Sequence, residues 1–206
     1  MLISDSNEFI FIHIPKTAGT SIRSALQSYS LQRPSSRLAR VLKRFDLPKD
    51  YRKFRFNLHA TLQKAQNKLP PELYGEYRKI AFVRNPFDRM VSNYAYKVHG
   101  TADKNRKRND SFEEFVLQCC SGKDLIQTDY LTDINGNLDC DFIGRFESLS
   151  EDYSKMQEIL GIELTPLANK NNSKRKGSYH DYYTDKTKNI VAKYYQKDID
   201  NFGYEF

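Results

Sequence analysis

An apolar run that ends in a short polar loop is the feature that most constrains the fold of this chain. Residues 9–14 read Phe-Ile-Phe-Ile-His-Ile, and Pro15 closes the run. Lys-Thr-Ala-Gly-Thr-Ser follows over residues 16–21, and apolar residues then recur at helical spacing as far as Tyr29. A strand, a tight loop and a helix N-terminus in this order gather main-chain N–H groups and the positive end of a helix dipole. The segment therefore predicts an α/β fold with a site for a phosphate-like anion.

The side chains of this loop also suit an anion, but not in the pattern of an ordinary nucleotide-binding loop. Lys16 supplies a positive charge. Thr17, Thr20 and Ser21 supply hydroxyl donors. The Walker A pattern G-x-x-x-x-G-K-[ST] places its lysine after the second glycine, whereas Lys16 precedes the only glycine of the loop, Gly19. We expect an anionic ligand other than a nucleoside triphosphate; a buried strand with a plain polar turn is the alternative.

A second junction of the same kind follows the strand expected at residues 79–83. Asn85 suits a helix N-cap, and Pro86 suits the first helical position. Arg84 would then stand at the carboxyl end of the strand, where open α/β sheets bind ligands. Arginine with the hydroxyl of Ser92 can hold a terminal phosphate. A surface arginine that only forms an ion pair is equally compatible with the sequence.

Together these two motifs resemble those of sulfotransferases that use 3′-phosphoadenosine 5′-phosphosulfate (PAPS). Ile-Pro-Lys-Thr-Ala-Gly-Thr-Ser is similar to their 5′-phosphosulfate loop, and Phe-Val-Arg-Asn-Pro-Phe-Asp-Arg-Met-Val-Ser is similar to their 3′-phosphate-binding motif. The similarity is closest to the carbohydrate-type family, which includes heparan sulfate 2-O- and chondroitin sulfotransferases and many short bacterial members. It extends into residues 141–147 and 182–204, so it spans nearly the whole chain.

The resemblance implies a role for each motif residue. Lys16 would contact the oxygen that bridges the sulfate and the 5′-phosphate, and Arg84 with Ser92 would hold the 3′-phosphate. The 5′-phosphate would be held by the main chain of Thr17, Ala18, Gly19 and Thr20 and by the hydroxyls of Thr20 and Ser21. The product would be 3′-phosphoadenosine 5′-phosphate (PAP).

The resemblance also implies a general base. The acceptor hydroxyl must lose a proton, and histidine is the commonest residue for this task. His59 lies in the interval where the family carries its catalytic histidine; a helix-capping or surface histidine is the alternative. Some relatives carry a second histidine two residues earlier, but this chain has Asn57 there, so position 57 supplies no neighbouring imidazole. Relatives close a late basic segment over the adenosine. Arg175 is our candidate within it because a guanidinium can fork onto phosphate, although a solvated loop fits equally well.

The net charge and the composition limit the classes of partner that this chain could bind. The formal net charge is +7, which attracts nucleic acid, an anionic membrane or an acidic glycan. Nucleic acid is not expected, because the basic residues lack the interleaved aromatics of a base-stacking platform. The strongly basic residues 32–56 suggest a face for an anionic glycan acceptor or a peripheral membrane contact, or else a solvated helix face. No metal is expected, because no C-x-x-C or H-x-x-x-H pattern occurs.

The compartment is inferred from what the sequence contains. Three cysteines, two of them adjacent, favour reduced thiols in a reducing compartment. No basic N-terminal region precedes an apolar core, and no run of about 18 apolar residues could span a membrane. We therefore expect a cytoplasmic protein without a transmembrane segment.

The sequence as a whole predicts one α/β domain over residues 1–206, with a central, mainly parallel β-sheet flanked by helices in a P-loop-like architecture. Strands are expected at 9–14, 79–83 and 139–146, and helices at 19–29, 61–68, 86–98, 111–120, 150–160 and 184–198. The predicted function is sulfuryl transfer from PAPS to a hydroxyl on a carbohydrate or glycoconjugate. A P-loop phosphotransferase and a non-catalytic polyanion-binding module are the alternatives.

Overall fold

The computed structural model describes residues 1–29, 56–99, 111–122, 125–167 and 177–206 of the chain. The chain divides into two compact units. The first comprises Met1–Val83 and Asp129–Ala168, and the second comprises Arg84–Thr128 and Asn169–Phe206. The single domain expected over residues 1–206 stays a prediction. The strongly basic residues 32–56 and the late basic segment with Arg175 lie almost wholly outside the described residues.

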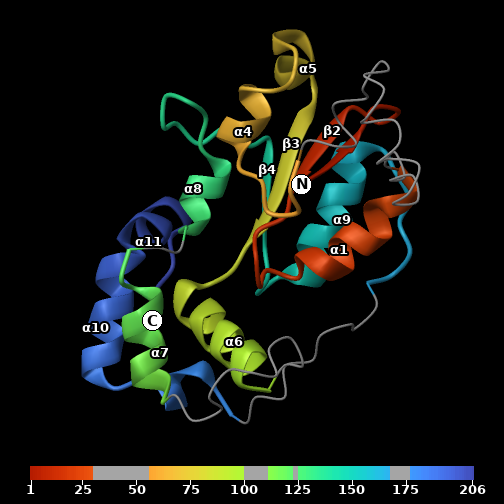
Figure 1. The fold of residues 1–206 in the computed structure, drawn as a ribbon. Helices are drawn as coiled ribbons and strands as arrows, with labels where there is room; N and C mark the ends of the chain where they lie inside the picture. The colour runs from red at the N-terminus through yellow and green to blue at the C-terminus, as the bar shows by residue number, and fades with distance from the viewer. Residues whose placement is uncertain (30–55, 100–110, 123–124, 168–176) are drawn as a thin grey trace, which may run out of the picture. The chain divides into compact units, whose positions relative to one another are not determined.

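The first unit holds a four-stranded sheet with the strand order β1-β2-β3-β4 (Figure 1). β1 (Leu2–Ser4) runs antiparallel to β2 (Phe9–Ile12), whereas β2, β3 (Arg78–Val83) and β4 (Phe142–Arg145) run parallel to one another. The expected mainly parallel sheet is confirmed. β1 was not expected, because a three-residue strand leaves no readable alternation in the sequence.

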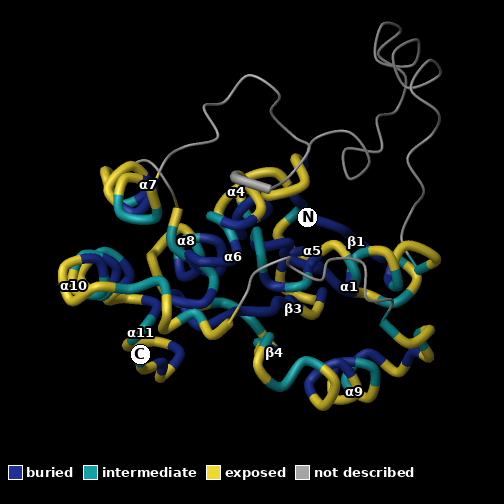
Figure 2. The backbone as a smooth tube through the Cα atoms, turned by 90° about the horizontal axis from the view of Figure 1, so that it is seen from below, coloured by how far each residue is buried: buried dark blue, intermediate teal, exposed yellow. Residues whose placement is uncertain are grey.

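One face of this sheet is covered by α1 (Gly19–Leu26) and α9 (Leu149–Leu160), which lie along it in Figure 1. Side chains alternate across a strand, so every second residue of β2 and β3 points toward these helices. The buried cluster comprises Leu2, Phe9, Phe11, Ile22, Leu26, Ile80, Phe82, Tyr153, Met156, Leu160 and Ile162. In Figure 2 the tube of α9 changes between buried and exposed residues along its length, as expected for a helix with one apolar face.

Shorter elements complete the first unit. The 3-10 helix η1 (Gln27–Tyr29) extends α1 to the end that we expected. α4 (Leu62–Gln66) begins after Thr61, whose hydroxyl accepts a hydrogen bond from Lys64 N. α5 (Pro71–Glu76) was not among the expected helices. Pro71 occupies its first turn, where the missing N–H of proline is no loss.

The second unit is helical. It contains α6 (Pro86–His99), α7 (Phe112–Cys119), η2 (Tyr179–Tyr182), α10 (Asp185–Tyr194) and α11 (Gln196–Phe202), and the short α8 (Gln127–Leu131) begins in it. Their apolar faces meet in a cluster of Phe87, Met90, Phe115, Val116, Cys119, Val191 and Tyr195. Across the described ranges, every helix is too short or too polar to span a bilayer.

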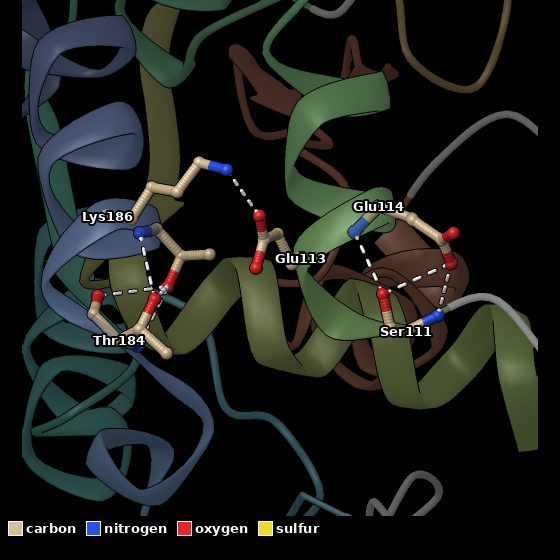
Figure 3. Close-up of polar contacts among 6 residues, drawn as sticks. Ser111, Glu113, Glu114, Thr184 and Lys186 are labelled. Carbon is tan, nitrogen blue, oxygen red and sulfur yellow. Dashed lines mark hydrogen bonds and ion pairs between the residues drawn. The ribbon is translucent and has the colours of Figure 1, made fainter.

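Local signals set several of these helix ends. Ser111 and Glu114 form a capping box at the start of α7, and Lys186 Nζ of α10 lies 2.7 Å from Glu113 Oε1 of α7 (Figure 3). One helix was expected over residues 184–198, but the structure has two. Tyr195 leaves the helical conformation at φ −99° and ψ 21° while its side chain stays buried, so core packing ends α10 there.

Candidate functional site

The loop between β2 and α1 has an unusual main-chain conformation. Lys16 and Ala18 lie in the left-handed region, at φ 71° and 62°. Such a conformation costs a non-glycine residue on the order of 1–3 kcal/mol and tends to persist at functional sites. Ala18 is also the N-cap of α1, and no side chain there accepts a hydrogen bond from the first helical N–H groups. A loop with left-handed residues that leads into a helix N-terminus without a side-chain cap is suited to an anion.

The loop hydroxyls divide into two roles. The Thr17 hydroxyl is buried and donates a hydrogen bond to the carbonyl oxygen of Ile14 at 3.1 Å. It therefore braces the loop and does not offer the donor that its position in the motif suggested. Thr20 is exposed and Ser21 is half-buried, as is Lys16. The Thr20 and Ser21 hydroxyls are thus the better candidates for contact with a ligand.

Gly19 is held against the imidazole of His13. A Cβ at position 19 would lie 2.1 Å from His13 Cδ2, so only glycine fits while the ring stays in place. His13 is 4% exposed, and no residue in the described part of the chain hydrogen-bonds its Nδ1. An unpaired buried nitrogen costs about 1–3 kcal/mol. Packing alone therefore does not explain an imidazole at this position, and such exceptions often mark function.

The His13 imidazole is neutral over the physiological pH range. Burial lowers its pKa to about 3, and the positive charges of His59, the Met1 nitrogen and Arg23 add to the effect. Phe11, two residues earlier on the same face of β2, stacks on the ring with centroids 6.2 Å apart. The ring is therefore enclosed by β2 and the start of α1.

His59 lies in the turn before α4, and its side chain is exposed. Its Nδ1 lies 2.8 Å from the carbonyl oxygen of His13. Because a carbonyl oxygen only accepts hydrogen bonds, Nδ1 must carry the proton, and Nε2 of the neutral ring holds the free lone pair. The helix-capping alternative for His59 is wrong, because Thr61 caps α4.

A second imidazole stands beside His59, although position 57 does not supply it. The His13 and His59 ring centroids are 4.7 Å apart, with the planes tilted by 57°. The sequence marked His13 only as a residue of a buried strand next to the loop; its pairing with a residue 46 positions away has no local signal.

In the second unit, Arg84 is buried rather than on the surface. It is 5% exposed, and its Nε and Nη2 lie 2.8 and 2.7 Å from Asp88 Oδ2. Ser92, which follows Asp88 by one helical turn on α6, is 4% exposed. The expected cap is confirmed, because Asn85 Oδ1 accepts a hydrogen bond from Phe87 N at 3.0 Å. Arg84 is thus ion-paired, as one alternative held, but it lies in the interior of the unit.

Two residues to which the sequence assigned no role hold the main chain of Arg84, one of them directly and the other through its neighbour. Gln127 Oε1 accepts a hydrogen bond from Arg84 N at 2.9 Å, and Gln127 Nε2 donates one to Arg84 O at 2.8 Å. Asp198 in turn accepts hydrogen bonds from Gln127 N and from Thr128 N and Oγ1, each at 2.8 Å. Gln127 and Asp198 are fully buried. This clamp spans segments 43 and 71 positions apart, so the sequence could not reveal it.

The candidate residues are distributed over the two units. Residues 16–21 and His59 belong to the first unit, and Arg84 and Ser92 belong to the second. Arg175 lies outside the described residues, so its role stays a prediction. Among the residues that the structure describes, no three His, Cys, Asp or Glu side chains gather as metal ligands would.

Comparison with known proteins identifies relatives of the chain. Its sequence matches the family model described as the sulfotransferase family over residues 1–205. A protein of Archaeoglobus fulgidus, described only as uncharacterized, is 34% identical over 98 residues, which are 47% of this chain and 78% of that protein. The crystal structure of mouse sulfotransferase SULT7A1 complexed with PAP superimposes with a TM-score of 0.58 at 16% identity, covering 97% of this chain and 87% of that one. This match confirms the expected P-loop-like α/β fold.

Proposed function

The chain belongs to the sulfotransferase family, and we propose that it transfers a sulfuryl group from PAPS to an acceptor hydroxyl and releases PAP. One observation carries the proposal: a strained loop with Lys16 at the uncapped N-terminus of α1, beside a histidine whose basic nitrogen is Nε2. The mouse sulfotransferase that shares the fold is complexed with PAP, which supports the same nucleotide here.

The residues of the first unit fit the charges of a phosphosulfate. Main-chain N–H groups from Thr17 to Thr20 and the hydroxyls of Thr20 and Ser21 would bind the 5′-phosphate. When bound, PAPS supplies an activated sulfuryl group whose bond to the 5′-phosphate oxygen breaks as the acceptor oxygen bonds to sulfur. Lys16 would neutralise the charge left on the phosphate oxygen. His59 Nε2 would take the acceptor proton, and its Nδ1–H stays hydrogen-bonded to His13 O.

The second unit supplies the candidate contacts for the 3′-phosphate. The Arg84 guanidinium is buried and oriented by Asp88, and a fixed guanidinium recognises phosphate better than a mobile one. Ser92 would add a hydroxyl donor. The resemblance of the motif to known 3′-phosphate sites supports this assignment, and it assigns Arg175 to the adenosine end of PAPS.

A carbohydrate or glycoconjugate is the proposed acceptor. The motifs are most similar to those of the carbohydrate-type family, and the net charge of +7 suits an anionic glycan. A cytoplasmic location and a peripheral membrane contact stay predictions.

A thermal-shift titration with PAP beside ADP, ATP and adenosine 5′-phosphosulfate tests the proposal. A ligand that binds only the folded state stabilises it by about 2.7 kcal/mol at a hundred times its Kd. We expect PAP to raise the Tm most, and Arg84→Ala to abolish the difference between PAP and ADP. A larger rise with ATP and magnesium would move the phosphotransferase to first place.

PAPS turnover separates an enzyme from a polyanion-binding module. Labelled PAPS is incubated with a panel of glycan acceptors and the wild-type protein, the Lys16→Ala protein or the His59→Ala protein. We expect the transferred sulfate to disappear in both variants. A variant series with unchanged heparin binding and no turnover even in the wild type would favour the non-catalytic module.

A further inference from the structure

The contacts of His13 point to a role in the candidate reaction that its buried place directly after β2 does not suggest. Its main chain and its ring act on two different partners, both within the first unit. The carbonyl oxygen holds Nδ1 of His59 at 2.8 Å. The ring contacts the His59 ring, at 4.7 Å between centroids, and closes on Gly19 at the start of α1.

We propose that His13 is a positioning residue, which sets the tautomer of His59 and its place relative to the phosphosulfate loop. This inference rests on the proposed function of the loop and of His59. His13 itself need not touch the donor or the acceptor, because it acts through its two neighbours.

The hydrogen bond between His59 Nδ1 and the His13 carbonyl oxygen selects one tautomer of His59. An unconstrained imidazole exchanges its proton between the two nitrogens, and only the form with a free Nε2 can use that atom as a base. The carbonyl oxygen of His13 keeps the His59 proton on Nδ1. The His13 ring packs against the His59 ring, which limits its rotation away from that acceptor. A second residue that orients the base in this way is a recurring part of acid–base sites.

Gly19 links the position of the loop to that of the His13 ring. A Cβ there would lie 2.1 Å from Cδ2 and 2.5 Å from Nε2 of His13, so loop and ring are in direct contact. The ring cannot give way easily, since it is 4% exposed and stacked on Phe11. The His13 ring therefore packs between His59 and the loop, and the distance between His59 and the loop depends on it.

The neutral state of His13 is consistent with this role. Burial keeps its pKa low, and the positive charges of His59, the Met1 nitrogen and Arg23 add to the effect. When His59 takes a proton, a neutral neighbour does not repel the new charge, whereas a second imidazolium would.

The test uses Gly19→Ala, His13→Ala and the double variant. Gly75→Ala in α5 is the matched control, because an added Cβ there meets nothing within 4 Å. PAP affinity is measured by calorimetry, and the His59 tautomer is read from ring ¹⁵N shifts in histidine-labelled protein, assigned with His59→Gln. If His13→Ala does not fold, His13→Asn opens the same space with a smaller planar side chain.

We expect Gly19→Ala to weaken PAP binding by about tenfold or more through overpacking. The double variant should regain most of that loss, since the space left by the ring accepts the new methyl group. His13→Ala keeps the main-chain acceptor but removes the ring that holds His59 against it. We therefore expect the Nδ1–H signature of His59 to give way to a mixture of the two tautomers while PAP affinity stays within about threefold. Gly75→Ala should change neither readout.

Two results would overturn the inference: strictly additive effects in the double variant, or an unchanged His59 signature without the His13 ring. The proposed function can fail separately. If the wild type binds no PAP, that function is wrong, while the ¹⁵N signature, which needs no ligand, still decides whether His13 sets the His59 tautomer.

Discussion

Single atoms decide the chemistry that His59 can perform. The proton on Nδ1 is held by a main-chain oxygen, so a substitution of His13 removes the packing around the base but not the acceptor itself. The buried Nδ1 of His13, without a partner in the described part of the chain, is by contrast a cost to folding. The contacts that orient His59 therefore leave a buried nitrogen of His13 unpaired among the residues that the structure describes, which lowers the stability of the folded protein.

His59→Gln should abolish the base and leave the nucleotide site intact. Loss of a general base lowers kcat by about 10²–10⁴-fold, and we expect the Kd for PAP to change by less than about threefold because His59 is assigned to the acceptor side. Turnover of labelled PAPS and calorimetry with PAP measure the two quantities. His180→Gln, a change at an exposed histidine of the second unit, is the control and should leave kcat unchanged. Equal losses in both variants would remove His59 from the reaction.

His13 should make the free energy of unfolding depend on pH. Its pKa is about 3 in the folded protein and 6.5 in an ordinary environment, so between these values the unfolded chain binds the extra proton. The stabilisation is complete above pH 6.5 and is lost as the pH falls toward 3, by at most about 1.4 kcal/mol per pH unit. Urea unfolding between about pH 7.5 and 4.5 should show a smaller slope against pH in His13→Asn than in the wild type. Identical slopes would mean that His13 does not titrate in this way.

The candidate site lies at the N-terminal ends of helices. The first turn of α1 faces the loop, and α6 begins two residues after Arg84. The main chain at that second point is fixed by α8 and α11 through Gln127 and Asp198. The position of Arg84 therefore depends on segments far along the chain, and a change there should be felt at the nucleotide.

Asp198→Asn tests this dependence with an isosteric change. Asp198 accepts hydrogen bonds from Gln127 N, Thr128 N and Thr128 Oγ1, and an amide nitrogen in place of one carboxylate oxygen cannot. We expect a loss of about 1.5–3 kcal/mol in the free energy of unfolding and weaker binding of PAP. Asp200→Asn on the exposed side of α11 should stay within about 0.5 kcal/mol. If PAP affinity survives in Asp198→Asn, Arg84 is held by other contacts.

Elements with local signals were predictable, and those that depend on distant partners were not. The β2–α1 junction, the Asn85 cap, the Ser111 capping box and the left-handed Gly161 after α9 all follow from residues within one turn. β1, α8 and the break at Tyr195 depend on pairing or packing across the chain. The same division holds in the candidate site. The loop and Arg84 were found from their motifs, whereas the pairing of His13 with His59 and the clamp of Gln127 needed the three-dimensional structure.

At the scale of the whole molecule, a net charge of +7 acts on every anion that approaches. Such a field raises association rates and retains polyanions without selecting among them. Selectivity for one nucleotide would come from groups with fixed positions, and Arg84 with its Asp88 partner at 2.7 Å is the proposed group. Surface charge and buried charge can be told apart because salt screens the first much more than the second.

Salt should therefore weaken polyanion binding far more than PAP binding. Between about 0.1 and 0.5 M KCl the Debye length falls below about 10 Å, so we expect heparin affinity to drop by more than about tenfold and PAP affinity by only a few-fold. Arg84 is 5% exposed, and its contribution to the PAP affinity should persist at high salt, where Arg84→Ala would still weaken binding. Fluorescence titrations of both ligands at several salt concentrations measure the two slopes. Parallel slopes, with no remaining effect of Arg84→Ala, would show that net charge alone holds the nucleotide, and the polyanion-binding module would then explain the chain better than a sulfotransferase.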